Sequence, residues 1–432
     1  MSAGDPHTTG APDPYQPGQV YAGPPGTVSP SAPQGSGPGG TAAGAGRSGA
    51  GHYSAVANPT RRPTLRRLTL YGIMIAGFLL CGAVLSYVLG SGLGIRTTVT
   101  VALLAALPLL VVVPTYLWVD RYEAEPRRFL AFGFAWGALC AAVGALVLNT
   151  FFSLALQVAG NQEADTLGAI VSAPVVEEGL KGLGILLIVL LRRKQFDGII
   201  DGIVYAGMIG AGFAFSENIL YLGRIYGEYG NQGLTQLFFL RCVMGPFAHP
   251  LFTAMTGIGI GVAVSVMRSR ATRIIAGLVG YAGAVMLHFI WNLSASTGNI
   301  FSVYLAFQVP LFLCFLGLLS WLRAREGRTI RTYLSQYADA GWLNHQEVAM
   351  LGSLPARRQA RAWAKQSGGP GALSSMRSFQ DAAADLALLR SRMARGVAEP
   401  EVSARERALL DAVVAHRAGF LGTAAYGPGV RV

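Results

Sequence analysis

Charged side chains are scarce in this sequence of 432 residues. Asp, Glu, Lys and Arg together make up 13% of it, whereas hydrophobic residues make up 52%. A soluble protein of this length carries about a quarter charged residues. The deficit is concentrated between residues 68 and 322, where apolar runs follow one another, each near the ~20 residues that cross a bilayer as a helix. The composition therefore predicts a membrane protein with several spans.

Cysteine is also rare, and its placement excludes two common uses. The four cysteines, Cys81, Cys140, Cys242 and Cys314, all fall inside apolar runs and show no C-x-x-C spacing. Zinc-binding and redox motifs need such pairs, so we expect thiols that pack as small apolar side chains. Residues 1–58 lack the apolar region of a signal peptide, and we expect membrane insertion to rely on the first spanning helix.

Eight apolar segments predict eight membrane-spanning helices. They are expected at residues 68–89, 97–119, 129–158, 168–191, 199–223, 237–266, 274–295 and 299–322. The expected fold is therefore all-α, a polytopic transmembrane helix bundle over residues 61–325. A Gly-, Pro-, Ser- and Ala-rich tail over residues 1–60 is expected to be disordered. Residues 326–432 are expected to form a small helical tail, with a break near Gly368.

The excess of positive charge lies at the ends of the spans. The net charge is +12, and arginine and lysine cluster before the first span, after the last one and in every second connection. Because basic connections stay in the cytoplasm, both termini of this multi-pass protein are expected on the cytoplasmic side of the cell membrane. The same pattern makes the lipid bilayer the expected surroundings and argues against nucleic acid as a partner.

A few polar side chains lie deep inside the apolar segments. The acids are Glu177, Glu178 and Glu217, Lys181 is the only deep base, and the two deep histidines are His249 and His288. With alternating helix directions and a rise of ~1.5 Å per residue, these groups lie roughly 8–18 Å below the outer face. The shared depth predicts one polar site. Asp201, near the cytoplasmic end of its span, is expected to cap a helix instead.

Lys181 is spaced to pair with both glutamates of its own helix. It follows Glu177 by four residues and Glu178 by three, and these spacings bring side chains together on a helix face. An ion pair offsets part of the cost of burial. Taken alone, the motif could therefore be an ion pair that stabilises the bundle and has no catalytic role. One buried histidine, taken alone, could likewise be a hydrogen-bonded packing residue with no catalytic role. All six groups at one depth favour a functional site.

These residues resemble the PrsW family of intramembrane proteases, which is related to the CAAX-protease and bacteriocin-processing superfamily. The resemblance spans residues 120–292 and rests on DRYEAEP, EEGLK, DGIVYAGMIGAGFAFSEN, and FAHPLFTAMTG with HFIWN, in that order. It implies a protease that hydrolyses peptide bonds of membrane-anchored proteins within or just outside the bilayer, and the shared depth of the polar residues favours a cut near the outer face. It also implies an anti-sigma factor as the candidate substrate, cut first in a site-1-type regulated proteolysis.

On the matching positions, the resemblance implies that Glu177 and Glu178 are the essential acids and that His249 and His288 face them. We expect Glu178 to activate water, Glu177 to support it, and the histidines to bind the water or the oxyanion. Four further residues are expected to support this group: Lys181, Glu217, Asn218 and Asn292.

Two questions stay open at this point. His249 and His288 with Glu178 could hold a zinc ion. Because HExxH is missing and the ligands would come from different helices, we expect no cofactor, with zinc as the alternative. Buried Glu and His also form proton relays, so an ion- or proton-coupled transporter is the rival function. The third candidate function is that of a non-catalytic relative that binds membrane peptides. Loss of activity in a folded Glu178→Gln variant would show that the protein is an enzyme and not such a relative.

Overall fold

The computed structural model describes residues 65–192, 196, 198–397 and 402–421. The tail expected at residues 1–60 lies outside them. Within the described ranges the chain forms helices and no strands. The all-α fold is therefore confirmed.

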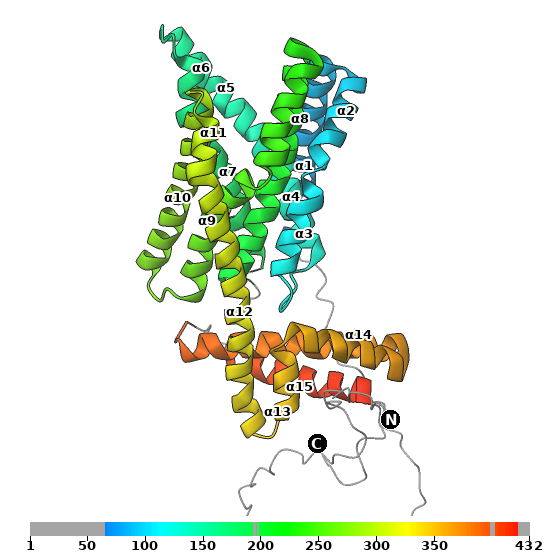
Figure 1. The fold of residues 1–432 in the computed structure, drawn as a ribbon. Coiled ribbons are helices and arrows are strands. Elements are labelled where there is room, and N and C mark those ends of the chain that lie inside the picture. The colour runs from blue at the N-terminus through cyan, green and yellow to red at the C-terminus, as the bar shows by residue number, and fades with distance from the viewer. Residues whose placement is uncertain (1–64, 193–195, 197, 398–401, 422–432) are drawn as a thin grey trace, which may run out of the picture.

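The helices follow one another along the chain with short connections, and η marks a π-helical segment that continues a neighbouring α-helix. They are α1 Leu65–Leu93, α2 Ile95–Ala106, α3 Leu109–Val119, α4 Arg127–Ala135, η1 Trp136–Ala141, α5 Ala142–Val158, α6 Ala164–Leu167, η2 Gly168–Ser172, α7 Ala173–Leu191, α8 Ile199–Phe238, η3 Phe239–Met244, α9 Ala248–Ser265, α10 Arg270–Ser296, α11 Ile300–Val303, η4 Tyr304–Gln308, α12 Val309–Asp339, α13 His345–Leu351, α14 Leu354–Ala394 and α15 Val402–Leu421. Helices α1 to α11 and the first half of α12 form an upright bundle (Figure 1).

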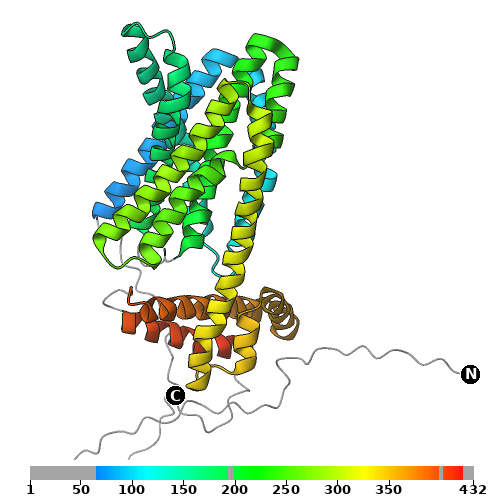
Figure 2. The same cartoon turned by 60° about the vertical axis from the view of Figure 1, so that its left-hand side comes forward.

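Six helical stretches in the described part of the chain are long and apolar enough to cross a membrane. One of them, Ile199–Ser265, joins α8, η3 and α9, and it bends back at Gly230, whose φ is 62° (Figure 2). Helix α7 is not among the six, because it carries three charged residues. Each of the eight expected segments coincides with a helical segment. The number of membrane crossings stays a prediction.

Helix α8 is the central element of the bundle. Its residues 201–213 are buried without interruption, and α9, α2, α3 and α4 pack around it. Small residues make this packing possible, since a Cβ on Gly202 would lie 2.1 Å from the Gly257 carbonyl oxygen of α9. Without water to drive association, close backbone approach is what holds membrane helices together. Asp201 caps this helix, as expected, by accepting a hydrogen bond of 3.0 Å from the Gly198 amide.

The C-terminal helices form a second layer beneath the bundle. Helix α12 leaves the bundle and continues to Asp339, and α13, α14 and α15 pack against its lower half (Figure 1). The expected boundary between residues 325 and 326 falls inside α12, so the division into domains stays a prediction. The expected break near Gly368 is confirmed, since Gly369 has a φ of 70° and bends α14.

Replacing Gly202 by Ala is expected to lower the free energy of unfolding by about 1–3 kcal/mol, because the new methyl group overpacks the α8–α9 contact. Thermal unfolding of the purified protein in detergent measures the effect. Gly277→Ala in α10 is the matched control, since no atom lies within 4 Å of a Cβ there. Equal shifts in the two variants would show that the close approach does not matter.

Candidate active site

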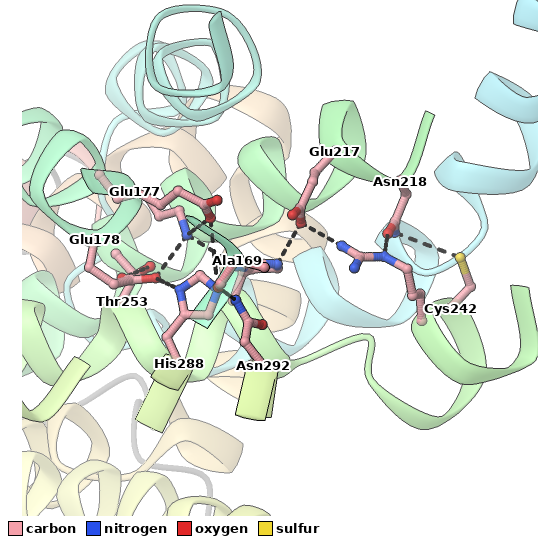
Figure 3. Close-up of polar contacts among 12 residues, drawn as sticks. Ala169, Glu177, Glu178, Glu217, Asn218, Cys242, Thr253, His288 and Asn292 are labelled. Carbon is pink, nitrogen blue, oxygen red and sulfur yellow. Dashed lines mark hydrogen bonds and ion pairs between the residues drawn. The ribbon is translucent and has the colours of Figure 1, made fainter. Parts of the chain in front are cut away.

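Six titratable side chains from four helices meet inside the bundle (Figure 3). Helix α7 supplies Glu177, Glu178 and Lys181, α8 supplies Glu217, α9 supplies His249 and α10 supplies His288. All but the partly buried Glu217 are buried. The structure therefore brings together the six residues that the sequence places at one depth.

The Lys181 ammonium lies at the centre of this cluster. Its Nζ is 2.8 Å from Glu178 Oε1, 3.5 Å from Glu177 Oε2 and 3.1 Å from His249 Nδ1. The ring of Phe213 lies beneath it, 3.8 Å away at the centroid. The Lys181 side chain is 0% exposed, so these contacts replace its hydration and tie α7 to α9.

The hydrogen bonds assign the proton positions on both histidines. An ammonium donates and does not accept, so Nδ1 of His249 accepts from Lys181 and its Nε2–H donates to Glu217 Oε2 at 2.7 Å. A carboxylate accepts, so Nδ1–H of His288 donates to Glu178 Oε1 at 3.1 Å. A neutral His288 then presents the lone pair of Nε2, which lies 3.8 Å from Glu177 Oε2.

The two adjacent glutamates have opposite surroundings. Glu178 is saturated: Oε1 accepts from Lys181 and His288, and Oε2 accepts from the Thr253 hydroxyl at 2.9 Å. Oε2 of Glu177 is buried and makes no hydrogen bond. It faces the Nε2 lone pair of His288, so two acceptors oppose each other. A group that donates to both, or a cation, fits between them.

Arg241 of η3 is a second buried cation that the sequence analysis missed. Its guanidinium donates to Glu217 Oε2 at 2.5 Å and to Asn218 Oδ1 at 2.8 Å, and it stacks on the ring of Tyr221. The prediction that Lys181 is the only deep base was therefore wrong. The signal was present, since Arg241 interrupts the apolar run LFFLRCVMG inside an expected span. Thr253, the partner of Glu178, was missed as well.

Charge counting singles out one carboxylate. With both histidines neutral, the cluster holds two cations and three carboxylates. Lys181 lies closer to Glu178, at 2.8 Å, than to Glu177, at 3.5 Å, and Arg241 pairs with Glu217. Glu177 is the carboxylate left over, and an unbalanced buried charge is costly. A proton or a bound cation at Glu177 removes that imbalance.

The two asparagines bond at the edge of the cluster. Asn218 accepts from Arg241, and its amide lies 3.7 Å from the Cys242 sulfur. Asn292 donates to the Ala169 carbonyl oxygen at 2.8 Å, which ties α10 to η2. Among the described residues, their side-chain hydrogen bonds do not reach the histidines. Lys181, Glu217 and Glu178 orient the imidazoles instead.

The DRYEAEP motif lies apart from the cluster, at the lower end of the bundle. Asp120 accepts a hydrogen bond of 2.7 Å from the Glu125 amide, and Glu125 pairs with Arg192. Tyr205 of α8 donates to the same Glu125 carboxylate at 2.7 Å. These contacts fix the α3–α4 connection to the base of α7 and α8.

A small, partly open cleft of about 20 Å³ lies at one side of the cluster. Its walls come from α2, α3, α8, α9 and α10, and its polar lining consists of Asn218, Arg241 and His249. The helical chain is interrupted beside it, between Met244 and Ala248. Non-helical backbone at membrane depth is tolerated where it is buried or lines a cavity, so this interruption belongs to the cleft wall.

One group of ligand atoms in the described chain has the composition of a metal site. Donor atoms of Glu177, His249 and His288 all lie within 4.8 Å of one another, and zinc takes such carboxylate and imidazole donors. The group contains Glu177 in place of the expected Glu178. Glu177 Oε2 and His288 Nε2 fit as they stand. Both nitrogens of His249 are engaged, so His249 fits once it releases Lys181 or Glu217.

Comparison with known proteins matches this same part of the chain. Residues 125–315 match the family described as PrsW family intramembrane metalloprotease. The chain is 34% identical to Protease PrsW of Clostridioides difficile over 158 residues, which are 36% of this chain and 62% of that protein. It is 29% identical to Protease PrsW of Oceanobacillus iheyensis over 218 residues, 50% of this chain and 92% of that one.

Protease PrsW of Geobacillus kaustophilus is 32% identical over 152 residues, 35% of this chain and 61% of that protein. Thus the chain spans less than two thirds of two of these relatives. No solved structure matches. The helical bundle, the buried acid–histidine cluster and these matches show similarity to a class of intramembrane proteases. Within that class, the chain is similar to the PrsW family, and the matched residues include the whole cluster.

Replacing Lys181 by Met is expected to lower the free energy of unfolding by about 3–5 kcal/mol, because it leaves a buried carboxylate without its counter-charge. Thermal unfolding in detergent measures the loss. Lys365→Met, at an exposed position of α14, is the control and should be neutral. A stable Lys181→Met protein would mean that the ammonium does not hold the cluster together.

Proposed function

We propose that this chain is an intramembrane endopeptidase that hydrolyses a peptide bond of a membrane-anchored protein near the outer face of the membrane. One observation carries the proposal. The unbonded Oε2 of Glu177 faces Nε2 of His288 inside a cluster whose other groups are all paired. This leaves one acidic group ready to take a proton, in a family of proteases.

Glu177 is the proposed general base. A water between Glu177 Oε2 and His288 Nε2 donates a proton to Glu177, and its oxygen bonds to the carbonyl carbon of the substrate. Accepting the proton removes the unbalanced negative charge of the cluster. Glu177 then gives the proton to the leaving nitrogen as the C–N bond breaks, so that atoms and charge balance.

Glu178 is proposed to position the other groups. The sequence analysis assigned water activation to Glu178 and support to Glu177, and the contacts favour the opposite division. Every oxygen of Glu178 is engaged with Lys181, His288 or Thr253. It fixes the proton of His288 on Nδ1 and keeps Nε2 free. Carboxylates that bond the far nitrogen of an imidazole orient the ring in this way in many sites.

Arg241 and His249 are proposed to face the substrate. Both line the cleft, whereas Glu177 and Glu178 do not. A guanidinium supplies fixed positive charge where the oxyanion of the attacked carbonyl develops. The substrate would have to be extended where it is cut, since a peptide bond within a helix is shielded by the turns around it.

The proposed reaction needs no metal ion or other cofactor. Lys181 already places a positive charge 3.1 Å from His249, and a divalent ion on that imidazole would repel it. The alternative is a zinc ion held by Glu177, His249 and His288, which would supply Lewis-acid polarisation of the water when bound.

An anti-sigma factor is proposed as the substrate, on the strength of the family resemblance. A single-span protein cut near the outer face fits the depth of the site. The location in the cell membrane with both termini in the cytoplasm is part of this proposal. A transporter would use the same buried acids as a proton relay, and protease relatives argue against it. The first test below distinguishes a protease from a relative that binds peptides without cleaving them.

Glu177→Gln is expected to reduce cleavage of a quenched single-span reporter in liposomes by about 100-fold or more, the usual contribution of a general base. Its melting temperature should stay at or above that of the wild type, since the variant removes an unbalanced charge. Glu178→Gln should lose both activity and stability, because it strips Lys181 and Thr253 of their acceptor. The control is Glu228→Gln in an exposed ion pair. Full cleavage by Glu177→Gln would refute the assignment of the base.

Removal of metal is expected to leave the rate of reporter cleavage unchanged. The purified protein is dialysed against a chelator, its zinc content is measured by elemental analysis, and cleavage is followed before and after. Activity with zinc far below one ion per chain supports the carboxylate reaction. Loss of activity that added zinc restores would instead assign Glu177, His249 and His288 as ligands.

A further inference from the structure

Six arginines gather where the C-terminal helices meet the lower end of the bundle. They come from the α3–α4 connection, from α12 and from α14: Arg121, Arg323, Arg357, Arg358, Arg361 and Arg377. We refer to them as the arginine cluster. Figure 1 shows α14 lying crosswise below the bundle, beside α12.

Hydrogen bonds hold two of these arginines, Arg357 and Arg361, in place. Arg357, which is buried, donates to the Tyr122 carbonyl oxygen at 2.7 Å and so ties α14 to the residue after Arg121. Arg361 donates to Gln380 Oε1 at 2.6 Å, and the side-chain amide of the same glutamine donates to the Arg357 carbonyl oxygen at 3.0 Å. Gln380 lies one turn from Arg377 on the second arm of α14.

The positive charges in this cluster exceed the negative ones. Three carboxylates lie among or beside them, Glu326, Asp381 and Asp385, and Asp381 lies 3.3 Å from Arg357. Burial lowers the pKa of Arg361, and three neighbouring cations lower it further: Arg377, Arg121 and Arg358. Among the described residues, the side chains of these three make no hydrogen bond or ion pair. Three guanidiniums are thus available to an anion.

Two tryptophans mark this level as the membrane surface. Arg323 lies over the ring of Trp118 at 3.9 Å, and Arg325 lies over the ring of Trp321 at 5.2 Å. Trp118 and Trp321 are 40% and 49% exposed. Tryptophan is enriched where a membrane protein passes from hydrocarbon to headgroups. The arginine cluster therefore lies at the depth of lipid phosphates rather than out in the cytoplasm.

We propose that the arginine cluster binds the phosphate headgroup of an anionic phospholipid, so that lipid holds the C-terminal helices against the bundle. Guanidinium groups bind phosphate oxygens in bidentate fashion. A basic pocket beside transmembrane helices on the cytoplasmic face suits such headgroups. A headgroup here bridges α14 to the α3–α4 connection, which also carries Glu125. The proposal is independent of the protease activity.

The test compares lipid binding by two variants with the same change in charge. The cluster variant is Arg358→Gln/Arg361→Gln/Arg377→Gln. The control is Arg127→Gln/Arg270→Gln/Arg328→Gln, three exposed arginines near the same end of the bundle. Native mass spectrometry of the full chain in detergent, titrated with phosphatidylglycerol or phosphatidylcholine, gives a dissociation constant for each lipid. Melting temperatures in phosphatidylcholine alone check that both variants fold.

The cluster variant is expected to bind phosphatidylglycerol at least about tenfold more weakly than the wild type, because each basic residue adds to the attraction of an anionic headgroup. The control should change less than about twofold, and phosphatidylcholine should not distinguish the three proteins. Equal weakening in both variants would overturn the site. So would displacement of the lipid by equimolar inorganic phosphate, which would assign a free anion. If the triple variant fails to fold, Arg377→Gln alone should still weaken binding, and unchanged binding would refute the proposal.

Discussion

A lysine ammonium with no exposed surface has to be neutralised inside the bundle, and the arrangement of the site follows from this constraint. Lys181 reaches a carboxylate on its own helix and an imidazole on α9. Those partners fix the next contacts, from His249 to Glu217 and from Glu178 to His288. Four helices are thereby held at fixed distances by charge-assisted hydrogen bonds, which are stronger than neutral ones.

The network also determines which group is left for chemistry. Two cations satisfy two carboxylates, and the third, Glu177, keeps an oxygen without a hydrogen bond. That oxygen faces His288, whose proton position is set by Glu178. The full pairing of the rest of the cluster keeps Glu177 in place while it exchanges a proton. Structural pairing and catalysis are thus divided between adjacent residues of one helix.

Much of the fold and the membership of the site could be predicted from the sequence. Apolar runs of spanning length mark the helices, and a shared depth marks the polar residues. The division of labour between Glu177 and Glu178 could not be predicted, because adjacent helical residues point ~100° apart and the sequence does not say which side meets Thr253. Arg241 was overlooked because its run reads as apolar. The bend at Gly230 depends on a positive φ that composition does not reveal.

The C-terminal helices show that a change in composition does not mark the end of a helix. The sequence turns polar after Leu322, yet α12 continues without a break to Asp339. Helix propensity and packing against α13 and α14 carry it across that change. Contacts such as that between Arg357 and Tyr122 join residues more than 200 positions apart, and no local pattern predicts them.

The central claim is that Glu177 activates a water molecule that attacks the peptide bond directly. A single turnover of the reporter in oxygen-18 water, followed by mass spectrometry of the product and of the Glu177 peptide, tests it most directly. The account predicts one oxygen-18 atom in the new C-terminal carboxylate and none in Glu177. An unlabelled product with the label on Glu177 would contradict it, because a glutamate that attacks the substrate itself leaves that pattern.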